Sequence, residues 1–239
     1  MASSLLTNLV AYYKLDELSG NPVDSSGNGF NLVNNGTTTY TQAMIANGAD
    51  FGATNTTKSL TITQNLGITG GNITMTCWVK MNTEIGSGEQ YFMFQESATN
   101  RNGYDITYSY NGGSRQILFR RLRKGVVQGG YNHSITLGTS NYYHLGLTYS
   151  SSTITAYVNG VSVGTASQSG AGTGGTTFDR FAIGASYSDN TISLRASAII
   201  DEVGVWSRAL TAAEMLEDFK NGAANQHPFN NSGFFFRMM

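Results

Sequence analysis

The acidic side chains are the first candidates for chemistry, because two carboxyl groups together can hydrolyse a glycosidic bond. A retaining hydrolase holds the two groups about 5–5.5 Å apart, so on a strand they must share one face. Adjacent residues of a strand point to opposite faces, which disqualifies Asp16 with Glu17 and Asp201 with Glu202. Glu89 and Glu96 lie too far apart along one strand. The spacing therefore predicts that the protein is not an enzyme.

The three histidines offer no alternative catalytic group. His133, His144 and His227 form no recognisable cluster with acids or with a nucleophile. Cys77 is the only cysteine, which excludes an intrachain disulfide and a cysteine-rich zinc site. Unpaired cysteines are among the most buried residues, so we predict that Cys77 is a small core residue.

Basic and aromatic residues gather in one part of the chain and are candidates for ligand binding. Five of the 14 basic residues fall within ten positions: Arg115, Arg120, Arg121, Arg123 and Lys124. Arginine and tyrosine stack on sugars or hydrogen-bond to acidic groups, and both are frequent anchors of protein interfaces. The alternative is that the tyrosines belong to the core and the arginines to a solvated strand. The residues predicted to contact a ligand are Tyr108, Tyr110, Arg120, Arg121, Arg123 and Tyr131.

Residues 24–29, Asp-Ser-Ser-Gly-Asn-Gly, form a short segment rich in oxygen atoms. Calcium takes roughly six to eight oxygen ligands from carboxylates, amides and backbone carbonyls, and Asp24 and Asn28 offer such groups. The alternative is an Asx-type turn, in which the Asp24 carboxylate accepts hydrogen bonds from its own backbone. Both interpretations are open from the residues alone.

Alternation of apolar and polar residues, which is typical of half-buried strands, recurs along the whole chain. In segment 73–81 the apolar residues share one face, and Trp78 stands on the other face among threonines and Lys80. This pattern must build the surface that positions the candidate residues. The strands that we predict are 9–15, 59–63, 73–81, 91–94, 104–110, 115–123, 142–149, 153–158, 178–185 and 194–206.

Two local signals add a turn and a helix. Asn159-Gly160 between β-branched runs predicts a two-residue hairpin turn, because both positions need positive φ. Segment 210–220 has the apolar spacing of a helix. We expect Thr211 to cap it, with Glu214 completing a capping box, and Gly222 to end it.

Composition limits the partners. The net charge of -1, from 14 basic and 15 acidic residues, argues against nucleic acid or another polyanion bound through bulk charge. No stretch approaches about 18 apolar residues, so no membrane span is expected. The N-terminus lacks the basic and apolar regions of a cleaved signal peptide. A length of 239 residues suits one all-β domain.

Four segments resemble one family in their order and spacing. They are similar to a laminin-G-like domain of the concanavalin A-like lectin/glucanase superfamily over roughly residues 8–222. The resemblance implies an all-β jelly-roll sandwich of two curved antiparallel sheets, with one short C-terminal helix. The segments are Leu9-Val-Ala-Tyr-Tyr-Lys-Leu-Asp-Glu17 with Asp24-Ser-Ser-Gly-Asn-Gly29, Ile73-Thr-Met-Thr-Cys-Trp-Val-Lys80, Tyr142-Tyr-His-Leu-Gly-Leu-Thr-Tyr149 with Tyr157-Val-Asn-Gly160, and Ile200-Asp-Glu-Val-Gly-Val-Trp-Ser-Arg-Ala-Leu-Thr-Ala-Ala-Glu214.

The resemblance also implies that the segment beginning at Asp201 lies close to the first strands, where family members often hold a structural calcium. Asp201 would then add a carboxylate to the oxygen atoms of the Asp24 loop. We therefore expect a structural Ca²⁺ bound by Asp24, Asn28 and Asp201.

The family is functionally diverse, so its fold does not settle the function. We expect a non-catalytic binding or adhesion module, for glycans at a viral (phage) or microbial surface. The first alternative is a structural virion protein, such as a capsid decoration, fibre or tail component, that uses the sandwich for protein contacts. A glycan-active enzyme is the third interpretation.

We divide the chain into a sandwich, residues 1–224, and an aromatic tail, residues 225–239. Residues 229–239 carry four phenylalanines and two methionines, a surface too apolar to remain in water. We predict that the tail, with Phe234, Phe235 and Phe236, packs on its own sandwich or against a second subunit of a homo-oligomer.

Overall fold

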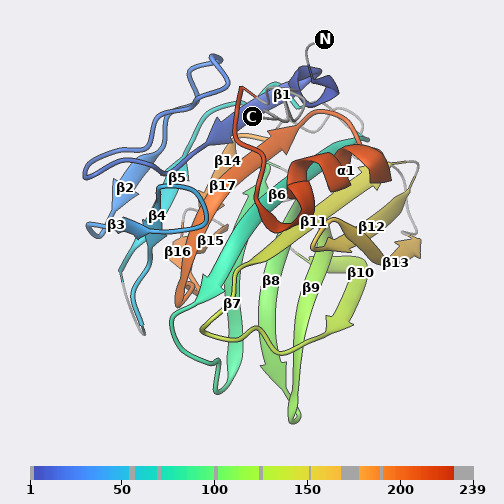
Figure 1. The fold of residues 1–239 in the computed structure, drawn as a ribbon. Coiled ribbons are helices and arrows are strands. Elements are labelled where there is room, and N and C mark those ends of the chain that lie inside the picture. Colours follow the sequence, from blue (N-terminus) through green and yellow to red (C-terminus); the bar gives the residue numbers. More distant parts are fainter. Residues whose placement is uncertain are drawn as a thin grey trace, which may run out of the picture.

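Two large antiparallel sheets make up the protein (Figure 1). The computed structural model describes residues 3–53, 57–68, 71–99, 102–123, 126–150, 152–167, 178–188 and 191–228. Phe234, Phe235 and Phe236, and with them the predicted packing of the tail, lie outside the described residues. Within the described part, no helix is long and apolar enough to cross a membrane.

The first sheet, sheet A, has eight strands, and β1 pairs with β17 beside the main order. Sheet B has seven strands, and a separate two-stranded hairpin follows β14. Sheet A runs β13 (Val161–Ser167), β12 (Thr153–Val158), β11 (Tyr143–Ser150), β6 (Ile73–Met81), β17 (Ala198–Trp206), β4 (Asn47–Asp50) and β3 (Thr39–Gln42), with β1 (Leu9–Tyr13). Sheet B runs β10 (Val126–Ser134), β9 (Ser114–Arg123), β8 (Gly103–Asn111), β7 (Gly88–Glu96), β14 (Arg180–Ile183), β5 (Ser59–Ile62) and β2 (Val33–Asn35), and the hairpin is β15 (Ser186–Ser188) with β16 (Thr191–Ser193).

The core lies between the inner faces of the two sheets. In β6 the alternating apolar residues Ile73, Met75, Cys77, Val79 and Met81 all enter it. Cys77 is completely buried, as predicted, and this burial raises the pKa of its thiol. The all-β sandwich of two antiparallel sheets that the family resemblance implied is confirmed.

The strands missed by the sequence lack clear alternation. β10 contains the pair Gly129–Gly130, yet it forms because β9 offers it a complete backbone ladder. The short strands β2, β3 and β4 and the two strands of the hairpin β15–β16 have three or four residues each, which is too few to show a period. They form because each pairs with a neighbouring strand. Pairing partners, and not local patterns, decide these elements.

The predicted turn and helix are both present. Asn159 (φ 51°) and Gly160 (φ 74°) join β12 to β13 with the positive φ values expected of a two-residue hairpin. Helix α1 (Ala212–Phe219) begins with the predicted capping box of Thr211 and Glu214. It ends before the predicted Gly222, because Lys220 adopts the left-handed conformation directly after Phe219 and a short 3₁₀ turn, η2 (Lys220–Gly222), follows.

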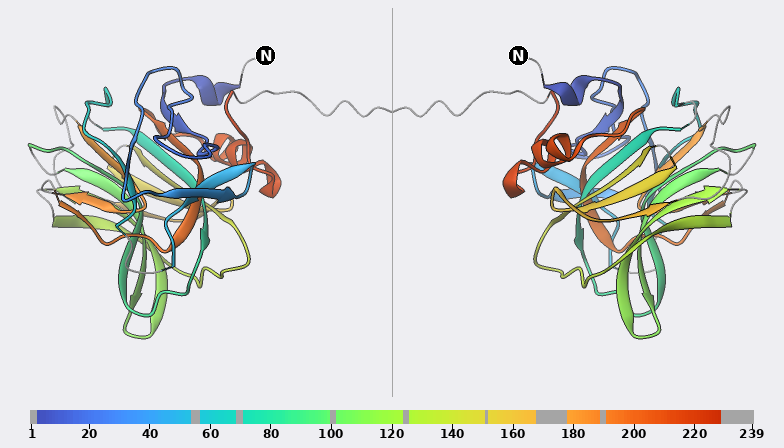
Figure 2. Two further views of the ribbon diagram at one scale, coloured as in Figure 1. Left: turned by 90° about the vertical axis from the view of Figure 1, so that its left-hand side faces the viewer. Right: turned by 90° about the vertical axis from the view of Figure 1, so that its right-hand side faces the viewer.

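Helix α1 covers the outer face of sheet A. Figure 2 shows α1, in red, on one side of the molecule and the green strands of sheet B on the other. The Phe219 ring stacks on Trp78 of β6 with ring centroids 5.5 Å apart. A Cβ at Gly146 would lie 2.7 Å from the sulfur of Met215, so a larger residue here would force the Met215 side chain to move.

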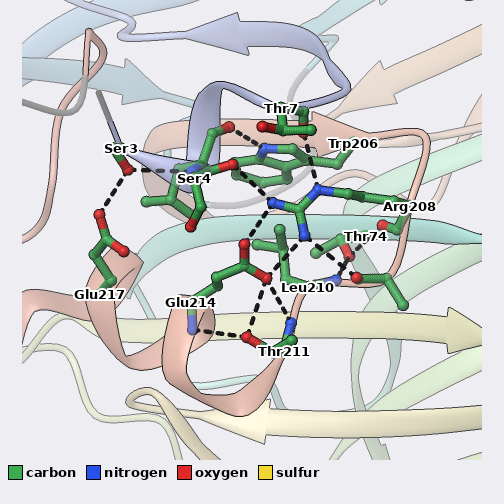
Figure 3. Close-up of polar contacts among 12 residues, drawn as sticks. Ser3, Ser4, Thr7, Thr74, Trp206, Arg208, Leu210, Thr211, Glu214 and Glu217 are labelled. Atoms are coloured by element: carbon green, nitrogen blue, oxygen red, sulfur yellow. Dashed lines mark hydrogen bonds and ion pairs between the residues drawn. The ribbon is translucent and has the colours of Figure 1, made fainter. Parts of the chain in front are cut away.

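Arg208 joins the N-terminal segment to the start of this helix (Figure 3). Its guanidinium donates to both carboxylate oxygens of Glu214 at 2.7 and 2.8 Å, and to the carbonyls of Ser4 and Thr7 at 2.9 Å. Arg208 lowers the pKa of the Glu214 carboxyl to about 2. The indole of Trp206 donates to the carbonyl of Leu5 at 2.7 Å, beside these contacts. The 3₁₀ turn η1 (Ser4–Leu6) is thereby fastened to β17 and α1.

Replacing Arg208 should destabilise the protein without changing its fold. Arg208→Ala removes hydrogen bonds to a carboxylate and to two carbonyls, and we expect the free energy of unfolding to fall by about 1–3 kcal/mol. Urea unfolding followed by circular dichroism measures this change. The control Arg123→Ala removes a similar side chain on sheet B, outside this cluster, and should change the stability by less than about 0.5 kcal/mol. Equal effects of the two variants would contradict the role given to Arg208.

Candidate functional site

The outer face of sheet B carries buried charged residues, although α1 leaves this face uncovered. Asp105 on β8 lies opposite Arg120 on β9, and neither exposes more than 7% of its surface. A bulge in β7 between Tyr91 and Met93 shifts the alternation, so that both Tyr91 and Phe94 face the same side as Asp105. Buried charges require partners, so this face must be organised around its ion pairs.

Arg120 is the centre of that organisation. Its Nε donates to Asp105 at 2.9 Å, and its two terminal nitrogens donate to the two carboxylate oxygens of Glu89 at 2.8 and 3.1 Å. It also donates to the hydroxyls of Tyr91 at 2.8 Å and Thr107 at 3.2 Å. Three adjacent strands therefore contribute to one network, which fixes the orientation of the Glu89 carboxylate.

Burial and neighbouring charges shift the pKa values of three residues of this network. Burial raises the pKa of Asp105 to about 6, in opposition to Arg120, which lowers it. Burial by itself would lower the pKa of Arg120, but Asp105 and Glu89 raise it above its ordinary value, so the guanidinium remains charged. Burial and the nearby Asp105 also raise the pKa of the Tyr91 hydroxyl. Burial and the neighbouring charges thus determine the charge state of Arg120 and the pKa values of Asp105 and Tyr91.

The hairpin β15–β16 lies against part of the same face. Tyr187 of β15 packs on an apolar group made of Tyr91, Phe94, Leu122 and Ala182. The guanidinium of Arg180 lies 5.7 Å from the centre of the Tyr187 ring, and Ser188 donates to Glu96 at 3.2 Å. The hairpin therefore forms one wall beside the charged network.

A pocket of about 460 Å³ opens where β7 begins, between the loop before β7 and the segment after β16. Glu89 connects it with the Arg120 network, and its side chain is 30% exposed. Glu84 also lines the pocket and pairs with Arg115 at 3.1 Å. The pocket is thus polar, and each of its two carboxylates forms an ion pair with an arginine. Its lining residues are Thr83, Glu84, Ile85, Gly86, Ser87, Glu89, Gln90, Leu194, Arg195, Ala196 and Ser197.

The six predicted ligand residues do not share one surface. Arg120 is on the outer face, whereas Arg121, the next residue, is buried with its guanidinium 5.1 Å from the centre of the Tyr149 ring. Tyr108 is fully buried and its hydroxyl accepts the amide of Leu137 at 2.9 Å. Tyr110 and Tyr131 pack against the core, and Arg123 is half-buried at the end of β9. The alternative of core tyrosines describes this part of the chain better.

The residues predicted to bind calcium are engaged elsewhere. The Asp24 carboxylate accepts the amides of Tyr12, Ser26 and Phe30 at 2.9–3.0 Å, as in the Asx-type alternative. The Asn28 amide donates to backbone carbonyls of β1. Asp201 accepts the amide of Ile45 at 2.9 Å.

The described residues contain no group of three or more acidic, histidine or cysteine side chains arranged for a metal ion. The structural Ca²⁺ expected at Asp24, Asn28 and Asp201 remains an untested prediction.

A second buried cluster, which the sequence did not reveal as a unit, forms at a bulge of β17. Glu202 accepts hydrogen bonds from the Tyr12 hydroxyl and from Gln226 at 2.7 Å, and Gln226 also donates to Asp16 at 3.1 Å. Burial, with the neighbouring Glu202 carboxyl, raises the pKa of Asp201 to about 9. Burial raises the pKa of Glu202 to about 8, although the hydrogen bonds from Tyr12 and Gln226 lower it. These carboxyls hold the C-terminal segment against β1 and β17.

Comparison with known proteins identifies the fold. A family model described as the concanavalin A-like lectin/glucanases superfamily matches residues 54–215. No curated protein matches the chain.

Solved structures resemble it over most of its length. A structure of botulinum neurotoxin type C, whose cell entry is dependent upon interaction with two ganglioside molecules, has a TM-score of 0.70 and 14% identity, covering 90% of this chain and 51% of that chain. Domain 4 of AbnA, an extracellular arabinanase from Geobacillus stearothermophilus, in complex with arabinotriose, has a TM-score of 0.63 and 18% identity, covering 88% and 97%. The binding domain of Paraclostridial Mosquitocidal Protein 1 has a TM-score of 0.68 and 17% identity, covering 90% and 52%. The chain spans about half the length of the neurotoxin and mosquitocidal chains.

The buried carboxyls of β17 should make the protein less stable as the pH rises. Asp201 and Glu202 keep their protons in the folded state up to about pH 9 and 8, whereas unfolded carboxyls lose them near pH 4. Unfolding then releases protons between about pH 4 and 9, so the free energy of unfolding falls across this range. Thermal melts between pH 5 and 9 measure the slope. Glu202→Gln, which resembles the protonated carboxyl, should flatten it, and an unchanged slope in this variant would contradict the assignment.

Removing Arg120 should be costly because it leaves Asp105 buried without its cation. We expect Arg120→Met to lower the free energy of unfolding by about 3–5 kcal/mol at pH 7. Arg120→Met combined with Asp105→Asn should recover part of this loss, since the buried charge is then gone. Chemical unfolding of the wild type, both single variants and the double variant tests the coupling. Strictly additive effects would show that the two side chains do not stabilise each other.

Proposed function

The chain belongs to the concanavalin A-like lectin/glucanase superfamily, and we propose that it is a non-catalytic glycan-binding module whose sugar site is the pocket at the start of β7. The observation that carries this proposal is the Glu89 carboxylate. It is partly exposed in a pocket of about 460 Å³, and Arg120 fixes it from behind with two hydrogen bonds.

A fixed carboxylate suits recognition of sugar hydroxyl groups. An ionised carboxylate only accepts hydrogen bonds, and each of its oxygens can take more than one. Arg120 occupies one side of the Glu89 carboxylate, which leaves the pocket side for hydroxyl donors. Because the carboxylate is already ordered, binding a sugar would not require it to lose further conformational freedom.

Other groups of the pocket complement hydroxyls. Gln90 accepts the amide of Ser197 at 2.9 Å through its side-chain oxygen, which orients its amide nitrogen as a donor. Leu194 supplies an apolar surface that is 48% exposed. A mixture of donors, acceptors and apolar surface matches the two kinds of surface on a pyranose ring, its hydroxyls and its C–H groups.

Two of the similar structures support the substrate class. The neurotoxin interacts with ganglioside molecules, and the arabinanase domain was solved in complex with arabinotriose. Their low identity establishes only the shared fold, so the sugar specificity of this chain rests on its own pocket.

The ion pairs of the pocket carboxylates argue against catalysis. Glu84 and Glu89 are each ion-paired with an arginine, whereas a general acid must retain its proton until it reaches the leaving group. Asp105 is completely buried and does not reach the pocket surface. Glu89 and Glu96 stand at opposite ends of β7.

We infer that the module works at the surface of a cell or a virus. The neurotoxin enters cells, and the arabinanase is extracellular. A sugar-binding pocket that is open at the edge of the sandwich suits a partner presented on another surface. Direct contact with cells or particles that display the bound glycan would test this placement.

Glycan binding should depend on the charge of Glu89. We expect the wild type to bind at least one oligosaccharide on a glycan array, and Glu89→Gln to bind it about tenfold more weakly, because the hydrogen bonds lose their charge assistance. Calorimetric titration measures the affinity. The control is Glu217→Gln on α1, whose side chain contacts Ser3 and not the pocket. Its affinity should equal that of the wild type.

Two results would contradict the proposal. One is a folded wild type that binds no glycan on the array, and the other is a Glu89→Gln variant that binds as tightly as the wild type. Release of reducing ends from a bound oligosaccharide would overturn the non-catalytic assignment while leaving the site in place.

A further inference from the structure

Arg195 brings a positive charge to the pocket that the protein itself does not neutralise. Four other arginines are paired with carboxylates: Arg115 with Glu84, Arg120 with Glu89 and Asp105, Arg180 with Glu96, and Arg208 with Glu214. No carboxylate pairs with Arg195 among the described residues. Its Nε is buried and has no hydrogen-bond partner within the same part of the chain. A buried N–H donor without a partner carries a free-energy cost, and the side chain as a whole lines the pocket.

The backbone around Arg195 is held firmly in place. The carbonyl of Leu194 accepts the amide of Tyr91 at 3.1 Å, and the amide of Ala196 donates to the carbonyl of Gly184 at 2.8 Å. The amide of Ser197 donates to Gln90 at 2.9 Å. Hydrogen bonds on both sides of Arg195 thus fasten this segment to β7 and to the end of β14. The backbone from which the Arg195 side chain extends is therefore fixed.

The residue before Arg195 adopts an uncommon conformation. Leu194 has a φ of 48°, in the left-handed region that leucine rarely occupies, and its side chain is 48% exposed in the pocket lining. Such a conformation costs roughly 1–2 kcal/mol, and strained residues of this kind cluster at binding sites. The strain and the exposed apolar side chain both occur where the unpaired arginine enters the pocket.

The two acidic residues of the pocket do not neutralise this arginine. Glu84 pairs with Arg115, and Glu89 pairs with Arg120, which also serves Asp105. Arg195 thus lines the pocket beside two carboxylates that each already have another arginine as partner. The pocket is complementary to a ligand that carries both hydroxyls and one anionic group.

We propose that the glycan bound in this pocket is acidic, and that Arg195 binds its anionic group, a carboxylate or a sulfate ester. This inference rests on the proposed glycan-binding function and specifies its ligand. A guanidinium forms two parallel hydrogen bonds with a planar carboxylate and also binds the oxygens of a sulfate. Glu89 and Gln90 would accept from and donate to the neutral hydroxyls of the same sugar.

The test compares three oligosaccharides of equal length. They are an oligogalacturonate, its carboxyl-reduced neutral galactan counterpart and a sulfated galactan. We expect wild-type protein to bind at least one of the two acidic forms at least tenfold more tightly than the neutral form, and the difference between the acidic forms distinguishes a carboxylate from a sulfate. The preference should weaken as salt is added, because exposed charges are screened.

The variant that isolates the proposal is Arg195→Gln. It should lose the preference for the acidic form while its affinity for the neutral oligosaccharide stays within about twofold of the wild type. Arg195→Lys should keep part of the preference, since the charge is retained without the planar donor pair. Lys80→Gln, which removes one positive charge from sheet A at a site outside the pocket, is the matched control and should keep the full preference.

The outcomes separate this inference from the function on which it rests. Equal binding of acidic and neutral forms by the wild type, or an unchanged preference in Arg195→Gln, would overturn the role of Arg195 and leave the glycan-binding module intact. Absence of binding to all three probes, together with an empty glycan array, would overturn both. Equal loss of preference in Arg195→Gln and Lys80→Gln would show that overall charge, and not Arg195, selects the ligand.

Discussion

The guanidinium of Arg120 lies almost wholly inside the protein, and a buried charge requires opposite charge and hydrogen bonds around it. Asp105 and Glu89 supply the charge, and Tyr91 adds a hydroxyl acceptor. These partners come from β7 and β8 while Arg120 comes from β9, so the three strands must keep one register for the network to form. The same requirement orients Glu89 at the pocket, and the organisation of the candidate site thus follows from the burial of one charge.

The outer faces of the two sheets differ in what packs against them. On sheet A, α1 packs against the outer face, with the close approach at Gly146 and the stacking of Phe219 on Trp78. On sheet B, the hairpin β15–β16 packs over only part of the face. The polar pocket beside it lies between two loops that the sheets hold in place. Loops positioned by a rigid scaffold are a common place for binding residues.

Much of the candidate site was beyond sequence reasoning, for a physical reason. Arg120 was identified because basic residues cluster on its strand, but Arg121, its neighbour, points into the core because successive residues of a strand alternate. Arg195 lies before β17, because this strand begins at Ala198 and not at residue 194 as predicted, and Glu84 lies in the loop before β7, about 110 positions away. They line one pocket because the segment before β17 and the loop before β7 lie side by side in the folded protein. A signal that sequence alone offered was the arginine count, and it does not reveal which arginine lacks a partner.

The sequence by itself determined the class of fold, the core strands, the hairpin turn at Asn159-Gly160 and the capping box of α1, because each depends on residues close together in the chain. It also determined that Cys77 is a core residue. The tertiary structure decided the strands without alternation, such as β10, and the engagement of Asp24 by its own loop. It alone decided which charges are paired. Pairing depends on distances between residues far apart in sequence, and these distances exist only after the sheets have formed.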